Sequence, residues 1–352
     1  MKPLRLVAAL PLIAVLACGP TPQGGPQTPR PGVGMPPTQA MLDDAARSFH
    51  QIRDGFVEWY LETHPVRASE LGVHQHDARL PDMTRAGVRD RTDDLLEWLA
   101  DLDALRFAFM RGDDRYDYAV LEYGIRAELL ALEESRDWAN DPRMYTAVIA
   151  RGLAAVAMWE YAPLAERVES LKSRMVGGAE LLPATRSNLR SPPRLWTELA
   201  IADARALVEY LEDDLPAVLA AQDDEALSGT GLEEARARLA DAVESHIEWL
   251  ESDLLPRSTG SYRLGRYLFQ RKLMYQEHVS LSVEELERLN QEALTEYRQK
   301  VEEAARSIDP DRTPREVMDS LDGLYPEPGE LLATARAMVT TVRDWVVESD
   351  MV

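Results

Sequence analysis

The stretch "AARSFHQIRDGFVEWYLETH", residues 45–64, decides the fold class, because its apolar residues recur at spacings of three and four. Those residues are Phe49, Ile52, Phe56, Trp59 and Tyr60. This spacing places them on one side of an α-helix. The pattern returns in "DDLLEWLADLDAL" (93–105), "DYAVLEYGIRAELLALEES" (117–135), "PRLWTELAIADARALVEYLEDDL" (193–215) and "GLEEARARLADAVESHIEWLESDLL" (231–255). We therefore predict an all-α fold, a multi-helix array of amphipathic helices.

The sequence also predicts where several helices begin and end. Ser282 with Glu285, and Thr313 with Glu316, have the spacing of a capping box, and Pro314 suits the first helical position. Breaks are expected at clusters of Gly, Pro and Ser, which disfavour helix. These clusters are "GG" (177–178), "SPP" (191–193), "LSGTG" (227–231), "RSTGS" (257–261) and "YPEPG" (325–329).

Composition and charge exclude some functions. The 352 residues carry a formal net charge of −22, which repels phosphate backbones, so we expect no nucleic-acid partner. The chain has one cysteine, Cys18, and an intrachain disulfide is therefore impossible. The sequence contains no P-loop, no dinucleotide-binding fingerprint and no G-x-S-x-G nucleophile elbow.

The first residues have the form of a targeting segment. A basic start and an apolar run over 6–17 predict a signal peptide at 1–17. The run ends in "VLAC" (15–18), which resembles the bacterial lipoprotein box and implies lipidation of Cys18, with the lipid bilayer as partner. An ordinary secretory signal is the alternative. Gly19 after the cysteine resembles outer-membrane sorting, so we expect a lipid-anchored protein of the bacterial cell envelope.

Residues 18–40 are expected to form the lipidated cysteine and a tether. The tether is rich in Pro and Gly, and its apolar residues do not recur at regular spacings. The helical domain is expected to occupy 41–352. Its last helix, "LLATARAMVTTVRDWVVESDMV" (331–352), is amphipathic. We expect this helix to lead onward, so that the chain is the N-terminal part of a longer protein.

The stretch "LETHPVRASELGVHQHDARLPD" (61–82) raises the question of a metal site. His74 and His76 form an H-x-H pair of the kind that zinc enzymes use, but further ligands at a suitable spacing are missing. We favour a polar turn between two helices, in which Asp77 and Arg79 pair or cap helix ends. A zinc site and a contact to substrate remain as alternatives.

Several stretches in fixed order resemble one bacterial family. They are Pro65 with Leu71-Gly72, Asp77 and Arg79-Leu80; "NDPRMY" (140–145); the segment 163–201; and "YRLGRYLFQRKLMYQEHVSLSVEEL" (262–286). Over roughly residues 45–352 this order is similar to the domain-of-unknown-function 885 family, helical proteins that look like zinc metallopeptidases. The resemblance implies zinc and a peptide substrate for a full-length protein. It also suggests Arg263, Arg266 and Tyr267 as polar contacts toward a cleft.

The family's chemistry depends on a helix similar to H-E-x-x-P-G-H, in which two histidines one turn apart bind zinc and the glutamate serves as base. This chain lacks that motif: "SHIEWLE" and "YQEHVS" contain no second histidine at the required spacing. His246 is expected to be half-buried on an amphipathic helix. We therefore assign no catalytic residue, no metal ligand and no cofactor within this chain.

The sequence leaves three functions open. The first is the N-terminal helical portion of an envelope lipoprotein that resembles zinc-dependent peptidases or amide hydrolases and is inactive alone. The second is a non-enzymatic, lipid-anchored helical interaction module. The third is an enzyme with a different site built on His74, His76 and carboxylates.

Overall fold

The computed structural model describes residues 37–351 apart from 224 and 324. The expected signal peptide, Cys18 and most of the tether lie outside these residues. The described part is all-α, as predicted; it contains no β-strand, although an isolated bridge joins Pro193 and Gly260. None of its helices combines the length and the apolar character needed to cross a bilayer.

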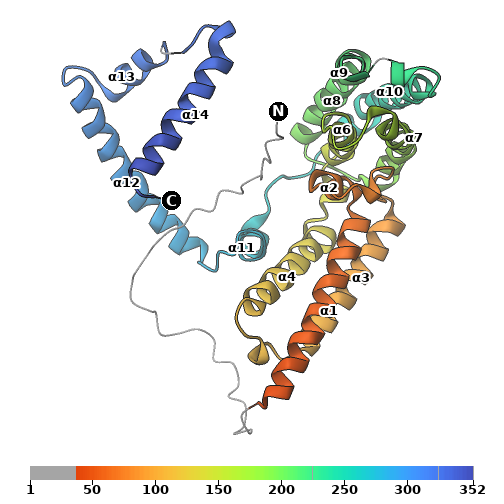
Figure 1. Cartoon of the computed structure of the whole chain (residues 1–352), viewed down its shortest axis with the longest axis horizontal. Helices are drawn as coiled ribbons and strands as arrows, with labels where there is room; N and C mark the ends of the chain where they lie inside the picture. The colour runs from red at the N-terminus through yellow and green to blue at the C-terminus, as the bar shows by residue number, and fades with distance from the viewer. Residues whose placement is uncertain (1–36, 224, 324, 352) are drawn as a thin grey trace.

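The first unit is built from three long helices, α1 (Gln39–Thr63), α3 (Arg85–Ala104) and α4 (Asp114–Leu129) (Figure 1). Helix α1 begins two residues before the expected domain start, with Thr38 as its N-cap. The apolar faces of the three helices meet in a core that contains the fully buried Phe49, Leu95, Leu102 and Ile125. The period of three and four thus has its expected cause, burial of one face of each helix.

Short elements connect this unit to the next. They are α2 (Pro65–Glu70), η1 (His74–His76), η2 (Phe107–Phe109), the π-helical η3 (Leu130–Ser135) and α5 (Asp137–Asn140). Pro65 is the first residue of α2, directly after His64 ends α1. A proline fits this position because the first helical N–H has no partner within the helix. The chain therefore turns sharply at the α1–α2 junction.

The second unit comprises five helices and their connections. They are α6 (Arg143–Ala157), α7 (Leu164–Asn188), α8 (Arg194–Glu209), η4 (Tyr210–Asp214), α9 (Leu215–Asp223), η5 (Glu225–Leu227), α10 (Leu232–Trp249), η6 (Leu250–Leu254) and η7 (Leu255–Arg257). Ile149, Leu171, Leu239 and Val243 are fully buried in its core. Helix α2 packs on α6 and so connects the two units.

One predicted break is wrong. The Gly177–Gly178 pair lies inside α7 rather than between helices. A Cβ on Gly178 would lie 3.1 Å from the side chain of Leu239 and 3.2 Å from that of Ile149. The glycine therefore allows α7 to approach α10 and α6 closely. The other predicted breaks, from "SPP" onward, all fall between α-helices, and three of them overlap the short helices η5, η7 and η8.

The C-terminal segment packs on α4 through its first helix, and its remaining helices form an arm that stands away from both units (Figure 1). Its elements are α11 (Gly265–Gln276), which packs on α4, then α12 (Val283–Ile308), α13 (Pro314–Leu321), η8 (Pro328–Glu330) and α14 (Leu331–Glu348). Both predicted capping boxes are present, at Ser282 and at Thr313. Helix α14 exposes Leu331, Leu332, Met338, Val339, Val342, Trp345 and Val347.

His246 is more deeply buried in α10 than the half-burial expected from the sequence. Its side chain is 2% exposed, it stacks on Trp249, and its Nε2 atom has no hydrogen-bond partner in the described part of the chain. Burial, with a smaller contribution from the nearby Arg186 charge, lowers the pKa of His246 from 6.5 to about 4. The folded protein therefore holds this imidazole neutral.

We predict that this histidine destabilises the fold in acid. Above pH 6.5 the imidazole is neutral in both the folded and the unfolded chain. Between pH 6.5 and about pH 4 it is protonated in the unfolded chain and remains neutral in the folded chain. The free energy of unfolding should therefore fall by up to about 3 kcal/mol across this interval. Chemical denaturation of wild type and His246→Phe at several pH values isolates the effect. A stability difference between the two that stays constant from pH 7 to pH 4 contradicts it.

Candidate functional site

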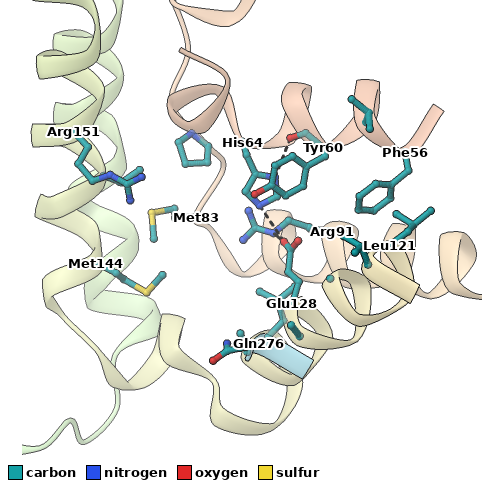
Figure 2. Close-up of a pocket in the computed structure, with 18 of the residues that line it drawn as sticks. Phe56, Tyr60, His64, Met83, Arg91, Leu121, Glu128, Met144, Arg151 and Gln276 are labelled. Atoms are coloured by element: carbon teal, nitrogen blue, oxygen red, sulfur yellow. Dashed lines mark hydrogen bonds and ion pairs between the residues drawn. The ribbon is translucent and has the colours of Figure 1, made fainter. Parts of the chain in front are cut away.

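A cavity of about 900 Å³ lies between α1 and α4 of the first unit and α6 of the second. Figure 2 shows its walls, with Gln276 of α11 at one side. Most of the lining is apolar: Phe56, Val57, Pro81, Met83, Val120, Leu121, Gly124, Ala127, Ala131, Leu132, Met144, Ala147 and Val148. The volume falls within the usual range for small-molecule sites, roughly 300–1,000 Å³.

A polar cluster interrupts this apolar wall. His64 ends α1, Arg91 comes from α3 and Glu128 from α4, and Figure 2 shows the histidine and the arginine converging on the glutamate. His64 Nε2 lies 3.1 Å from Glu128 Oε1, and Arg91 Nε lies 3.5 Å from the same oxygen. Because an ionised carboxylate only accepts, a hydrogen bond in this contact requires the proton on Nε2 of His64, while Nδ1 lies 3.0 Å from the carbonyl oxygen of Tyr60.

The cluster is largely shielded from water. The side chains of His64, Arg91 and Glu128 are 22%, 14% and 18% exposed. Tyr60 stacks on the His64 ring, and burial together with the negative charge of Glu128 raises the pKa of its hydroxyl. The low local dielectric strengthens each of these polar contacts and makes any unpaired charge costly.

Two further arginines at the cavity form ion pairs. Arg151 of α6 makes a two-pronged contact with Glu70 of α2, with both N–O distances 2.8 Å. Arg53 of α1 contacts Asp117 of α4 at 3.3 Å and the neighbouring Asp54 at 2.9 Å. These pairs join the helices that form the cavity walls.

The residues that line the cavity can bind a ligand and transfer a proton. A histidine–carboxylate pair can accept or supply a proton. The lining contains no serine, threonine or cysteine that could act as a nucleophile. No group of three His, Cys, Asp or Glu side chains in the described residues is arranged to hold a metal ion. The described residues therefore offer no donor set for the zinc that the family resemblance implies.

The histidine-rich turn does not bring its two histidines together. His74 Nδ1 contacts Asp77 at 2.9 Å and its ring stacks on Tyr161, with centroids 3.4 Å apart. The ring of His76 instead faces Arg79, with a 2.7 Å contact between Nδ1 and the guanidinium. The predicted polar turn is present as η1, but each histidine has its own partner.

Asp77 and Arg79 do not pair with each other. Asp77 is 3% exposed and accepts hydrogen bonds from Ser69 and Tyr161. Burial, together with the hydrogen bond to Asp77, raises the pKa of Tyr161. Arg79 lies at the surface, 3.4 Å from Glu62. The reason is geometric: the one-turn η1 points Asp77 inward toward α2 and leaves Arg79 outside.

Arg174 of α7 is the charge that balances Asp77. Its side chain is fully buried, and its guanidinium lies 3.9 Å from Asp77, with Ser69 Oγ between them. It donates to the backbone carbonyls of Pro65 at 3.2 Å, Arg79 at 3.1 Å and Gly152 at 2.5 Å. One side chain therefore joins α2, the turn after η1, α6 and α7.

The remaining predicted contacts lie away from the cavity. Arg263 and Tyr267 are exposed near the start of α11, and the Tyr267 ring lies under Arg271. Arg266 pairs with Glu284 at the start of α12. None of the three lines the cavity. Helix α11 reaches the cavity through Gln276 instead, because its C-terminal end is the end that packs beside α4.

Arg91, Glu128 and Arg174 were not predicted from the sequence. Arg174 leaves a readable signal, since it follows Leu171 by three residues and precedes Gly178 by four on the buried side of α7. A charged residue on an apolar helical stripe indicates a buried, paired charge. Arg91 and Glu128 leave no such signal, because their meeting with His64 depends on how three helices pack.

The fold and cavity define a helical protein with a large apolar site between two helical units. Residues 65–350 match the family described as "Bacterial protein of unknown function (DUF885)". The match covers most of the chain, and the protein belongs to this family. No curated protein matches it.

A solved structure shares the fold. It is described as "The structure of a putative lipoprotein of unknown function from Shewanella oneidensis" and matches with a TM-score of 0.70 at 20% identity. The alignment covers 86% of this chain and 58% of that chain. This chain thus corresponds to a little over half the length of the protein it resembles.

We predict that Arg174 is essential for stability and Arg79 is not. Arg174→Met removes the charge that balances Asp77 and takes one donor away from the carbonyls of Pro65, Arg79 and Gly152, which should cost about 3–5 kcal/mol. Arg79→Met removes only a surface pair and should cost at most about 1 kcal/mol. Urea denaturation measures both. Equal losses for the two variants would show that the buried contacts of Arg174 do not hold the units together.

Proposed function

We propose that the protein is a lipid-anchored envelope protein that binds an apolar, peptide-like ligand in the cavity between α1, α4 and α6. We further propose that it corresponds to the N-terminal part of a longer protein, a zinc-dependent peptidase or amide hydrolase whose metal-binding residues lie outside this chain. In that role the chain supplies a binding wall and carries out no hydrolysis alone.

The cavity is the observation that carries the proposal. Small residues, among them Gly124, Ala127 and Ala147, line it where larger apolar side chains would fill it. An apolar cavity that is open to solvent leaves apolar surface unburied, at a cost in stability. Retaining one of this size with a buried polar cluster in its wall is typical of a ligand site.

The idea of a longer protein has separate support. The structural neighbour extends well beyond the aligned part, since only 58% of its length is covered. The arm also exposes a run of apolar side chains, such as Met338, Val342 and Trp345. Exposed apolar patches of this kind mark surfaces that contact other protein.

The same arm favours a second candidate, a non-enzymatic interaction module. In that case the apolar face of α14 would contact another protein rather than further helices of the same polypeptide. The lipid anchor serves either candidate. It is supported by the "VLAC" sequence that ends at Cys18, and the structural neighbour is itself described as a "putative lipoprotein".

We predict that Cys18 carries the lipid. The protein expressed in a Gram-negative host with alkyne-labelled palmitate should incorporate label, and Cys18→Ala should abolish incorporation because the thiol is the acceptor. Gly19→Ser, which leaves the cysteine in place, should keep the label. A wild-type chain that is processed and stays unlabelled would refute lipidation.

We predict that filling the cavity blocks apolar ligands. A Cβ at Gly124 meets no atom within 4 Å, so Gly124→Phe can extend into the cavity, and replacing a helical glycine favours folding. Binding of the uncharged fluorophore N-phenyl-1-naphthylamine should weaken by about tenfold.

Gly323→Phe is the matched control, since Gly323 also has open space but lies in the arm. Fluorescence titration of the three proteins measures the affinity. The proposal fails if the fluorophore does not bind wild type, or if Gly124→Phe binds it as tightly as wild type does.

A further inference from the structure

Arg91 is incompletely paired for a buried cation. Its side chain is 14% exposed, and its Nε atom is buried without a hydrogen-bond partner in the described part of the chain. Its contact with Glu128, at 3.5 Å, is an ion pair that is too long for a strong hydrogen bond. A guanidinium carries five N–H donors, and buried donors are normally matched by acceptors.

The other lining cations are already matched. Arg151 has both prongs on Glu70, and Arg53 contacts two aspartates. Glu128 in turn is held by His64 at 3.1 Å. Among the described residues that line the cavity, Arg91 is therefore the arginine whose guanidinium makes no hydrogen bond to the protein and can offer its donors to an anionic group.

The surroundings of Arg91 define the anion. A carboxylate matches the planar fork of a guanidinium with two parallel hydrogen bonds. Glu128 stays close by, so each added negative charge on a ligand is repelled, which favours a monoanion over a doubly charged phosphate. Beyond the cluster most of the lining is apolar, from Phe56 to Met144 (Figure 2).

We propose that the cavity takes an amphipathic monocarboxylate, with its carboxylate on Arg91 and its apolar body along α1, α4 and α6. This inference rests on the proposed binding function and specifies its ligand. Two sources share the chemistry: a free fatty acid, and the free C-terminal end of a short apolar peptide.

The test compares ligands that differ only at the head group. Decanoate and decan-1-ol are titrated against the bound neutral fluorophore on the full chain, as wild type, Arg91→Met and Arg89→Met. Arg89 lies two residues away on the same helix and is exposed, which makes it the matched control. Wild type and Arg89→Met should prefer decanoate by about tenfold or more, as expected for hydrogen bonds to a charged group.

Arg91→Met should lose that preference and keep its affinity for decan-1-ol and for the fluorophore. Equal affinities for acid and alcohol in wild type, with the fluorophore bound, would overturn this inference alone. Failure of the fluorophore to bind would overturn the proposed binding function as well. A preference that survives in Arg91→Met would also overturn the assignment to Arg91.

The two sources are separated with the tripeptide Leu-Leu-Leu as free acid and as amide. Arg91-dependent preference for the free acid supports the inference and identifies a peptide C-terminus. Arg91-dependent preference confined to decanoate supports it equally and identifies a fatty acid.

Discussion

The buried guanidinium of Arg174 is the contact on which the arrangement of the two helical units depends. It donates to the carbonyls of Pro65 and Gly152, which belong to α2 and α6. Hydrogen bonds to a charged group contribute about 1.5–3 kcal/mol each, and an unpaired charge at this depth would cost more than they provide. These contacts favour the observed arrangement of α2, the turn after η1, α6 and α7, because separating the segments would take acceptors away from a buried cation.

That arrangement also sets the cavity. Pro65 directly follows His64, so the carbonyl bound by Arg174 is one residue from the polar cluster in the cavity wall. The opposite wall belongs to α6, whose Gly152 carbonyl binds the same guanidinium and whose Arg151 pairs with Glu70. The α1–α2 junction thus serves both the fold and the site. The contacts at this junction join the two units and also position the residues that face the cavity.

Much of the fold could be predicted from the sequence, because helix formation is dominated by local apolar spacing and by caps such as Ser282 and Thr313. The error at Gly178 is instructive. Glycine disfavours a helix by propensity, but close packing of three helices around it outweighs that local cost. The family was also identifiable, since its pattern is spread along the chain in order.

The candidate site could not be predicted in the same way. His64, Arg91 and Glu128 are separated by 27 and 37 positions, and only tertiary packing brings them together. The histidine-rich turn drew attention by composition, although its polar residues stabilise the junction rather than face a ligand. An apolar cavity has no sequence signal of its own, because its lining residues have the same composition as a core.

The most direct test of the account is to locate a neutral apolar ligand on the protein. Methionine methyl groups serve as probes in NMR spectra of methyl-labelled protein: Met83 and Met144 line the cavity, whereas Met318 and Met338 are exposed on the arm. Titration with decan-1-ol should shift the signals of Met83 and Met144 to saturation and leave those of the arm in place. Shifts confined to Met318 and Met338 would place apolar binding on the arm and contradict a ligand site in the cavity.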